Sequence, residues 1–430
     1  MHVSHQVPPG ALSGVRVLDL TQVMAGAYCS MLLADMGADV IKIERPGGGD
    51  DTRRMSRGPD VEHSPAFNAM NRNKRGIAVD LKDPRGAEVV RRLARDADVL
   101  VENFRPGLLD RFGLGQEELR AANPALVYCS ISGFGATGPY AGRGGYDLIA
   151  QAMSGLMSMT GEPGRPPAKV GVPICDLNAG VFGAYGVLSA YIHRLRTGEG
   201  QFVDTSLLEA GIAYTVWETA MFFSLGDVAR PMGSAHRLSA PYEALPTADG
   251  FIAIGAANDR NWERLCSALG MERLLRDPRF ATNPARMEYR FELAGELAAT
   301  LRRRTTAEWL EVLHAAGVPS GPLYDIEQVY ADPHVQARDM LVETVHPRMG
   351  TVRHIGAPVK LSGTPSTIRR PAPLLGQHSR EVLAEAGMPA AEIDELLAAG
   401  VLVTTPPDDD HARPAPGAGS SPLDPTEVPA

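Results

Sequence analysis

The sequence predicts an α/β protein in which helices cover both faces of a mainly parallel sheet and a smaller α+β domain follows. Short β-branched runs alternate with helical stretches over the first half of the chain, and such alternation is typical of parallel sheets. This alternation of short β-branched runs and helical stretches ends at about residue 227. The chain has 430 residues, of which 44% are hydrophobic and 22% charged, so it is long enough to bury two cores.

Each expected strand of the first half is a short apolar run. The strands are expected at residues 14–20, 39–44, 76–81, 98–103, 125–132 and 201–206. The helices are expected at residues 25–36, 84–95, 176–193 and 207–225. Gly37 is a typical left-handed terminator for the first helix, and Asp83 followed by Pro84 is a favourable start for the second.

We expect the chain to leave the large domain and later return to it. Residues 1–226 form the N-terminal part of the large domain, residues 227–338 the small domain, and residues 339–403 the return. In the small domain we expect a strand at residues 251–258 and helices at residues 261–269 and within 277–315. Residues 404–430 contain hardly any large apolar side chain, which predicts a disordered Pro-rich tail.

Composition argues against several classes of function. The longest uncharged apolar run, residues 178–192, is shorter than the roughly 18 to 20 residues that a membrane span requires. Residues 1–14 lack the basic and apolar regions of a secretory signal. The four cysteines lie far apart without metal-ligand spacing, so we expect reduced core thiols and a cytoplasmic location. A net charge of −9 argues against a nucleic-acid partner.

One region departs from this acidic balance. Residues 42–75 carry eight basic and five acidic side chains. The cations lie beside a Gly-rich segment and could hold phosphates through charge-assisted hydrogen bonds. They could equally belong to a solvated surface loop, which composition slightly favours.

A literal GxGxxG motif spans residues 133–138 after an expected strand. A dinucleotide site requires such a loop to open directly into a helix and to follow the first strand of the sheet. Here Pro139 follows at once, and the next residues are still typical of a loop. We therefore interpret the motif as a flexible loop and not as a nicotinamide site.

Asp176 lies where an apolar run meets the start of a helix, in the segment GVPICDLNAG. As an N-cap it would stabilise the helix by about 1 kcal/mol. A carboxylate at a helix N-terminus among small residues is also how a nucleophilic aspartate is presented to a bulky ligand. The pattern leaves both roles open. It is equally ambiguous for Tyr146 and Asp147, which could pack a loop or line a site, and for His236 as a proton carrier.

Several segments occur in an order that resembles the family III coenzyme A (CoA) transferases, which include formyl-CoA and carnitine-CoA transferases. They include LDLTQVMAGAYCSMLLADMGADVIKIERPGGGDDTR, NRNKRGIAVDLKDPRG, VENFRPG, GYDLIAQAMSG, GVPICDLNAG, APYEALPTADGFIAIGAAN and GVPSGPLYDIEQVYADP. The resemblance covers nearly everything from residue 12 to about residue 403. Three segments, GSAHRLSAPY, HPRMGTVRHIGAP and LLGQH, are most similar to the succinyl-CoA:glutarate type, which moves CoA between dicarboxylates.

The resemblance implies a Rossmann-like large domain, a small domain and an interlocked homodimer. It implies acyl-CoA and a carboxylic acid as substrates, with no permanently bound cofactor and no metal. Asp176 falls on the family's catalytic aspartate, which attacks the thioester and carries the acyl group as an anhydride. We expect this carboxylate to be ionised at neutral pH, since the reference pKa is about 3.9.

The resemblance also implies a set of residues that contact CoA. These are Arg45, Lys74, Arg75, Asn103, Phe104 and Arg111, with Tyr146 and Asp147 as further residues of the site. A family lysine that helps to hold CoA falls near Gly144, so this contact is missing unless Arg143 replaces it. Arg143, His236 and Arg237 are candidates for binding the distal carboxylate of a dicarboxylate.

Other differences from related enzymes of this fold reduce the number of possible activities. Met24 replaces a glutamine of the formyl-CoA enzymes, and GSAHRL replaces their tetraglycine lid, which argues against an oxalate-specific formyl transferase. The same fold hosts α-methylacyl-CoA racemases, whose proton-transferring histidine and glutamate fall on Tyr146 and Asn258. Neither residue can exchange protons near pH 7, so the transferase is favoured and the racemase is the alternative.

Overall fold

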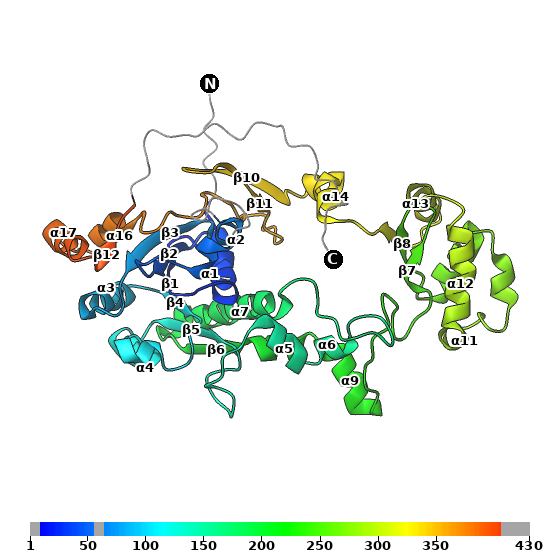
Figure 1. Ribbon diagram of the computed structural model, residues 1–430, viewed down its shortest axis with the longest axis horizontal. Coiled ribbons are helices and arrows are strands. Elements are labelled where there is room, and N and C mark those ends of the chain that lie inside the picture. The colour runs from blue at the N-terminus through cyan, green and yellow to red at the C-terminus, as the bar shows by residue number, and fades with distance from the viewer. Residues whose placement is uncertain (1–8, 56–63, 406–430) are drawn as a thin grey trace, which may run out of the picture. The chain divides into compact units, whose positions relative to one another are not determined.

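The structure is a computed structural model that describes residues 9–55 and 64–405. The chain divides into two compact units (Figure 1). The first runs through Ala150, takes Pro173–Ala213 and resumes at Arg338, and the second consists of Gln151–Val172 and Tyr214–Ala337. The expected return to the large domain begins at residue 339. From residue 406 onward, the expected disordered tail lies outside the described residues.

The first unit contains a seven-stranded sheet with the order β12-β3-β2-β1-β4-β5-β6. Its strands are β1 (Arg16–Asp19), β2 (Asp39–Glu44), β3 (Lys74–Val79), β4 (Val99–Glu102), β5 (Val127–Ser132), β6 (Phe202–Ser206) and β12 (Leu402–Val403). All neighbouring pairs are parallel except β12 with β3. The prediction of a mainly parallel sheet is confirmed.

The strand order reverses its direction between β1 and β4. The chain first builds outward from β1 through β2 to β3 and then returns to the other side of β1 with β4. This is the order of doubly wound Rossmann folds, whose ligands bind beside the carboxyl ends of the strands at the reversal. The topology therefore locates a binding site before any side chain is considered.

Helices cover both faces of this sheet. On one face, Val90 and Leu93 of α3 (Pro84–Arg95) share a buried core with Leu18, Ile41 and Leu100 of the strands. This core also includes side chains of α4 (Gln116–Ala122), α16 (Ser379–Glu385) and α17 (Ala390–Ala398). On the other face, α1 (Ala25–Asp35) and α7 (Ile174–Thr197) lie side by side (Figure 1).

Shorter elements complete the first unit. They are η1 (Asp51–Arg54), α2 (Pro65–Asn71), η2 (Leu109–Phe112), α5 (Asp147–Met153), which extends past the unit boundary, α8 (Leu207–Ala213) and the hairpin of β10 (Leu341–His346) and β11 (Gly350–Ile355). No helix among the described residues is both long and apolar enough to span a bilayer. All four cysteines are buried free thiols, as expected.

The second unit is an α+β arrangement. Its antiparallel sheet consists of β7 (Tyr242–Pro246), β8 (Phe251–Gly255) and β9 (Ser320–Pro322). Its helices are α6 (Leu156–Met159), α9 (Val216–Leu225), α10 (Asp259–Ala268), η3 (Glu272–Arg276), α11 (Asn283–Glu288), α12 (Arg290–Leu301), α13 (Thr306–Ala315), α14 (Ile326–Ala331) and α15 (Pro333–Ala337). Trp262, Leu265, Phe280 and Leu297 belong to its buried core.

The second unit begins earlier than the expected boundary at residue 227. The apolar stretch 207–225, expected as one helix, forms α8 and α9 with a break at Tyr214–Thr215. The unit boundary falls at this break. Because the residues on both sides of it are apolar, hydrophobic periodicity does not mark the change of unit.

Candidate active site

A cavity of about 420 Å³ lies at the carboxyl edge of the large sheet. Four loops line it, namely those that follow β1, β4, β5 and β6, together with the first turn of α7. The lining residues include Gln22–Ala25, Asn103–Pro106, Ile131–Gly133, Arg143–Tyr146, Asp176 and Leu207. The cavity therefore occupies the point where the strand order reverses, and its volume lies in the range of small-molecule sites.

Asn103 joins two walls of this cavity. Its side-chain Oδ1 accepts a hydrogen bond from the Gln22 N–H at 2.7 Å, and its Nδ2 donates to the Gln22 carbonyl oxygen at 2.8 Å. Asn103 follows β4 and Gln22 follows β1, the two strands at the reversal. The amide thus fixes the first strand-to-helix loop against the neighbouring loop.

Asp176 is the third residue of α7, and it lines the cavity. The N-cap position belongs to Pro173, so the interpretation of Asp176 as an N-cap is wrong. The N-terminal end of α7 is held instead by Asp147, the first residue of α5. Its Oδ1 accepts hydrogen bonds from the backbone N–H groups of Cys175 at 2.9 Å and Asp176 at 3.4 Å.

The surroundings of Asp176 change its protonation. Burial, and secondarily the nearby Asp147 carboxylate, raise the pKa of Asp176 from 3.8 to about 7, because both disfavour the charged form. The expectation that this carboxylate is fully ionised at neutral pH is therefore corrected. A strongly shifted carboxylate in a cleft is a common mark of a functional site.

The model of the family described as CoA-transferase family III matches residues 12–379. The chain belongs to this family. The succinate–glutarate CoA-transferase of Agrobacterium fabrum is 43% identical over 384 residues, which cover 88% of this chain and 96% of that protein. The succinyl-CoA:glutarate CoA-transferase of Mus musculus is 40% identical over 394 residues, covering 91% of this chain and 90% of that protein.

A solved structure agrees with the fold of this family III CoA-transferase. The crystal structure of a CAIB/BAIF family protein from Brucella suis superposes with a TM-score of 0.80 at 38% sequence identity. The superposition covers 88% of this chain and 100% of that chain. The chain is therefore an enzyme that transfers CoA, and the cavity is its candidate active site.

The structure brings four of the predicted site residues to the cavity. They are Asp176, Asn103, Phe104 and Tyr146, the last of which is 80% exposed. Asp147 lies next to them and holds the start of α7. Arg45 and Arg111 are exposed elsewhere on the first unit, with Arg45 in an ion pair with Asp51. As contacts for CoA, these two arginines stay predictions.

Lys74 does not fit the predicted contact with CoA. Its ammonium is fully buried at the start of β3 and donates to Asp19 Oδ2 at 2.8 Å, Asn71 Oδ1 at 2.8 Å and the Ala27 carbonyl oxygen at 3.0 Å. An ammonium has three hydrogens to donate, so none is left for a phosphate. The prediction is corrected: Lys74 ties β1, α1 and α2 together.

Arg75 is corrected for a similar reason. Its guanidinium is buried and pairs with Asp39, Glu381 and Glu385 at 2.6 to 2.9 Å. It connects β2 and β3 to α16. The same holds for Lys42, Arg53 and Arg72, which are buried against Asp50, Glu44 and Asp35. Most of the cations that the structure describes between residues 42 and 75 are therefore paired inside the fold, and for these buried side chains neither a phosphate clamp nor a solvated loop is the right description.

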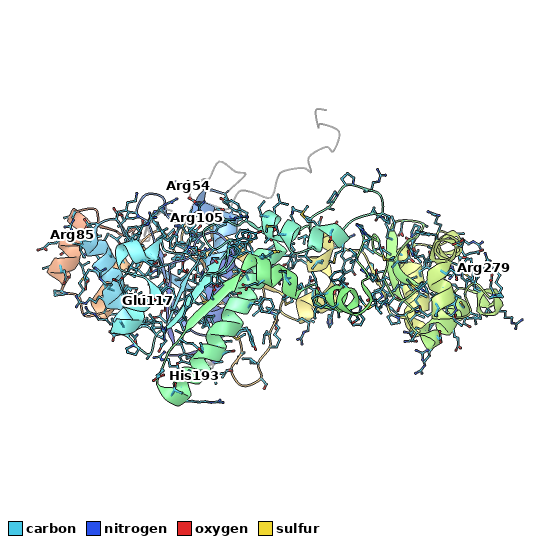
Figure 2. The ribbon with its side chains drawn as sticks, turned by 90° about the horizontal axis from the view of Figure 1, so that it is seen from below. Arg54, Arg85, Arg105, Glu117, His193 and Arg279 are labelled. Carbon is cyan, nitrogen blue, oxygen red and sulfur yellow. The ribbon has the colours of Figure 1, made fainter. Side chains whose placement is uncertain are left out.

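Arg105 is a cavity residue that the sequence analysis missed. It follows Phe104, is exposed and lines the cavity. A Cβ atom added to Gly144 would lie 3.1 Å from Arg105 Nη2. Figure 2 shows Arg105 at the opposite end of the first unit from His193, which lies near the C-terminal end of α7. Because its guanidinium lies this close to Gly144, Arg105 occupies the space beside the position where the family lysine is missing. Its place in the VENFRPG segment is the signal that could have found it.

Arg143 also lines the cavity, with its guanidinium 3.9 Å from the ring centroid of Tyr140. The other two candidates for a distal carboxylate belong to the second unit. Arg237 pairs with Asp227, and His236 Nδ1 accepts the Leu238 N–H at 3.2 Å.

Two alternative activities find no support in the geometry. The loop of residues 133–138 does not lead into a helix, since α5 begins only at Asp147. Asn258, at the racemase glutamate position, caps α10 by accepting the Asn261 N–H at 2.8 Å. Among the described residues, no group of three or more His, Cys, Asp or Glu side chains is arranged to hold a metal ion.

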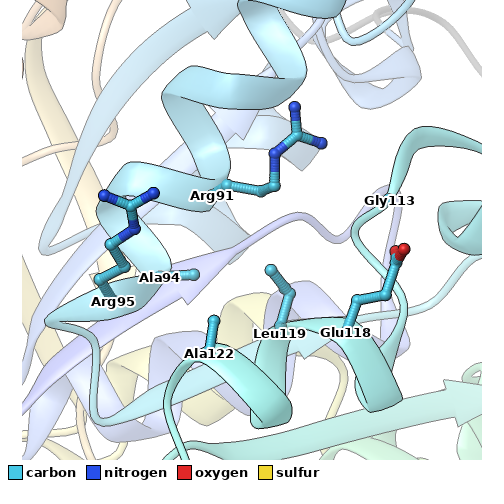
Figure 3. Close-up of a pocket in the computed structure, with 7 residues that line it drawn as sticks. All are labelled: Arg91, Ala94, Arg95, Gly113, Glu118, Leu119 and Ala122. Carbon is cyan, nitrogen blue, oxygen red and sulfur yellow. The ribbon is translucent and has the colours of Figure 1, made fainter.

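A smaller cavity of about 270 Å³ lies between α3 and α4 (Figure 3). It contains none of the predicted site residues. Arg91, on its wall, donates to Glu88 Oε2 at 2.8 Å and to the Phe112 carbonyl oxygen at 2.9 Å. The guanidinium of Arg91 is therefore already hydrogen-bonded within the protein.

Proposed function

We propose that this enzyme moves CoA from succinyl-CoA to a dicarboxylate acceptor such as glutarate, and that Asp176 carries the acyl group. The observation that carries the proposal is a half-buried carboxylate in the first turn of α7, on the wall of a cavity at the reversal of the sheet. The names of the Agrobacterium fabrum and Mus musculus relatives support this choice of substrates.

The first half of the reaction transfers the acyl group to Asp176. The carboxylate oxygen attacks the thioester carbonyl carbon, a C–O bond forms, the C–S bond breaks and CoA leaves as the thiolate. The product is an anhydride of Asp176 with the donor acid. The thiolate then attacks the aspartyl carbonyl carbon, so that an enzyme thioester forms and the donor acid leaves as its carboxylate.

The second half repeats these steps in the other direction. The acceptor carboxylate attacks the enzyme thioester and forms a new anhydride with Asp176, releasing the thiolate. The thiolate attacks the acceptor's carbonyl carbon, which yields the new acyl-CoA and restores the Asp176 carboxylate. Each step consumes one anion and forms another, so no proton donor or acceptor is required. This agrees with a cavity in which tyrosine stands at the racemase histidine position.

The raised pKa of Asp176 acts in two opposing ways. The protonated acid cannot attack a carbonyl carbon, so the reactive fraction grows as the pH rises through about 7. A more basic carboxylate is also a stronger nucleophile, as linear free-energy relationships for acyl transfer lead one to expect. Burial thus produces a reactive anion at the cost of populating it less at acidic pH.

We infer that Asn103, Phe104 and Tyr146 line the path of CoA to Asp176, with Arg105 supplying the cation that replaces the missing family lysine. These contacts hold CoA through parts of the molecule that are remote from its thiol. The attack of the returning thiolate is then effectively intramolecular, which is worth several kcal/mol. Arg45 and Arg111 are proposed to hold phosphates at the nucleotide end of CoA, because both are exposed cations.

We also propose that the enzyme is an interlocked homodimer in the cytoplasm. The apolar stripe on α7 supports self-association. Its members, Val181, Tyr185, Leu188, Ile192 and Leu195, are all exposed. Their alternating spacing of four and three residues is typical of a helix that packs against another helix. The location is supported by four buried thiols in the free state, as is usual in a reducing compartment.

The test combines a substrate screen with trapping of the acyl-enzyme. Succinyl-CoA is incubated with a panel of mono- and dicarboxylic acids, and new CoA esters are identified by mass. Hydroxylamine added during turnover should convert Asp176 to a hydroxamate that peptide mass spectrometry locates. Asp176→Ala should abolish both signals, while Asp110→Ala, an exposed aspartate that does not line the cavity, should keep them.

Three results would contradict the proposal. An Asp176→Ala enzyme that retains more than about a tenth of the turnover number has lost only about 1.4 kcal/mol of barrier lowering, too little for a covalent nucleophile. A hydroxamate found on another carboxylate would move the nucleophile. A wild-type enzyme that uses only monocarboxylates would refute the acceptor class.

A further inference from the structure

The loop after β1 holds an unusual backbone conformation at the edge of the cavity. Val23 has a φ angle of +63°. A β-branched residue in this region is a genuine outlier, because its side chain crowds the backbone. Such conformations persist only when the surrounding structure determines them, and they cluster at functional sites. Gln22, Val23, Met24 and Ala25 all line the cavity that Asp176 lines.

The carboxylate of Asp50 holds this valine in place. The Val23 N–H donates to both oxygens of Asp50, at 3.1 and 3.2 Å. Asp50 is only 1% exposed, and it also accepts the Thr52 N–H at 2.9 Å and the Thr52 hydroxyl at 2.7 Å. Its own position is fixed by Glu44, whose Oε1 accepts the Asp50 N–H at 2.9 Å.

Lys42 links the same carboxylate to a second point on the loop. Its fully buried ammonium donates to Asp50 Oδ2 at 3.0 Å and to the Thr21 carbonyl oxygen at 2.5 Å. One buried ion pair therefore binds backbone groups on both sides of Gln22, which Asn103 holds from the opposite side. Every residue from Thr21 to Val23 thus has a backbone group bound by a side chain.

We propose that Asp50, supported by Lys42, is a positioning residue that keeps the loop of residues 21–24 in its strained, reactive arrangement against Asp176. This inference rests on the proposed function. Asp50 does not line the cavity, so it acts through the loop. Its removal should harm the chemical step more than it harms acyl-CoA affinity.

The test exploits the fact that glycine adopts positive φ angles without crowding. Asp50→Asn keeps the shape of the side chain and removes its charge, which leaves Lys42 without its closest ion-pair partner. We expect the turnover number to fall about ten- to hundredfold, as a displacement near the reacting atoms does, while the KM for acyl-CoA changes less than about threefold. In a Val23→Gly background, Asp50→Asn should cost less than about threefold, because the strain that Asp50 opposes is gone.

Asp35→Asn is the matched control. Asp35 is a buried carboxylate of the same unit, it pairs with Arg72 and Asn73, and it does not touch the loop. It should lower stability without lowering the turnover number. Equal losses of turnover in Asp35→Asn and Asp50→Asn would overturn the inference. It would also be overturned if Asp50→Asn lowered the turnover number as much in the Val23→Gly background as in the wild type.

Hydrogen exchange tests the clamp independently of catalysis. In a peptide that spans residues 18–28, the amides should exchange about tenfold faster in Asp50→Asn than in the wild type, and at the wild-type rate in Asp35→Asn. Unchanged exchange in Asp50→Asn would overturn the inference. If the wild-type enzyme transfers CoA to no acid, the proposed function fails, and the exchange experiment still decides whether Asp50 holds the loop.

Discussion

At the scale of single residues, two carboxylates with different surroundings have different roles at the start of α7. Asp147 uses its oxygen to bind the first amides of the helix, and Asp176 presents its own oxygen to the cavity. Because the two lie close together, the charge on Asp147 adds to burial in raising the pKa of Asp176. The same group therefore holds the start of α7 and raises the pKa of the proposed nucleophile.

This arrangement predicts a pH dependence with a definite sign. In the wild type, kcat/KM for acyl-CoA should rise with pH through about 7 and then level off, since kcat/KM reports the free enzyme. Asp147→Asn keeps an oxygen that can accept the Cys175 N–H and removes the like charge. The Asp176 carboxylate is then less disfavoured, its pKa falls, and the rise in kcat/KM moves to lower pH.

The measurement is a profile of kcat/KM from pH 5 to 9 for both enzymes. The ratio of kcat/KM at pH 6 to that at pH 8 should be larger in Asp147→Asn. Burial, the larger cause, remains in the variant, so the shift should be partial. A rise displaced to higher pH in Asp147→Asn would contradict the electrostatic account.

At the scale of elements, close contact of α7 with α1 fixes where Asp176 stands. A Cβ atom on Gly180 would lie 2.6 Å from the Ala25 carbonyl oxygen, and one on Gly183 would lie 2.6 Å from Ile131 Cδ1. Glycine therefore allows α7 to approach both α1 and β5. Since Ala25 itself lines the cavity, the same contact sets the distance between two of its walls.

Gly180→Ala should destabilise the protein although alanine is the better helix former. The propensity gain is about 1 kcal/mol, but the obstructing atom belongs to the backbone and cannot rotate away. We expect a net loss of about 1–3 kcal/mol in the free energy of unfolding and a lower turnover number. Gly295→Ala in α12 is the control, because a Cβ there meets no atom within 4 Å.

Thermal unfolding and steady-state kinetics of the two variants decide this prediction. Gly295→Ala should raise the melting temperature slightly and leave the turnover number unchanged. A Gly180→Ala enzyme that is as stable and as active as the wild type would show that α1 and α7 can separate freely.

At the scale of the whole molecule, the exposed surface of α7 suggests a partner. The five stripe residues, Val181 to Leu195, are 37% to 69% exposed, and contiguous apolar patches on a surface mark interaction sites. We assign the stripe to a second copy of the chain, as the proposed homodimer requires.

Leu188→Glu, at the centre of the stripe, should weaken the dimer at least about 100-fold. This corresponds to about 2.8 kcal/mol of association free energy, and burying an unpaired charge costs several kcal/mol. Glu117→Lys on α4 is the control, as an exposed charge change outside the stripe (Figure 2). Sedimentation velocity across a dilution series measures the effect. A wild type that sediments as a monomer at every concentration would contradict the dimer itself.

Local patterns in the sequence are enough to predict the class of the large unit and many of its elements. The expected strand at residues 39–44 and helix at residues 84–95 match β2 and α3, because their signals are local: a short run of β-branched apolar side chains for the strand, and an N-cap at Asp83 with a proline after it for the helix. The resemblance identified the family and named Asp176, which lines the cavity.

Which charged side chains are free to bind a ligand depends on the three-dimensional fold. The basic residues near Lys74 suggested CoA contacts, but β3 lies inside the sheet, so Lys74 and Arg75 meet carboxylates from distant parts of the chain. The pKa of Asp176 and the strain at Val23 are likewise invisible in the sequence. Both depend on atoms brought together by the strand order, whereas a sequence pattern reports only what neighbouring residues impose on one another.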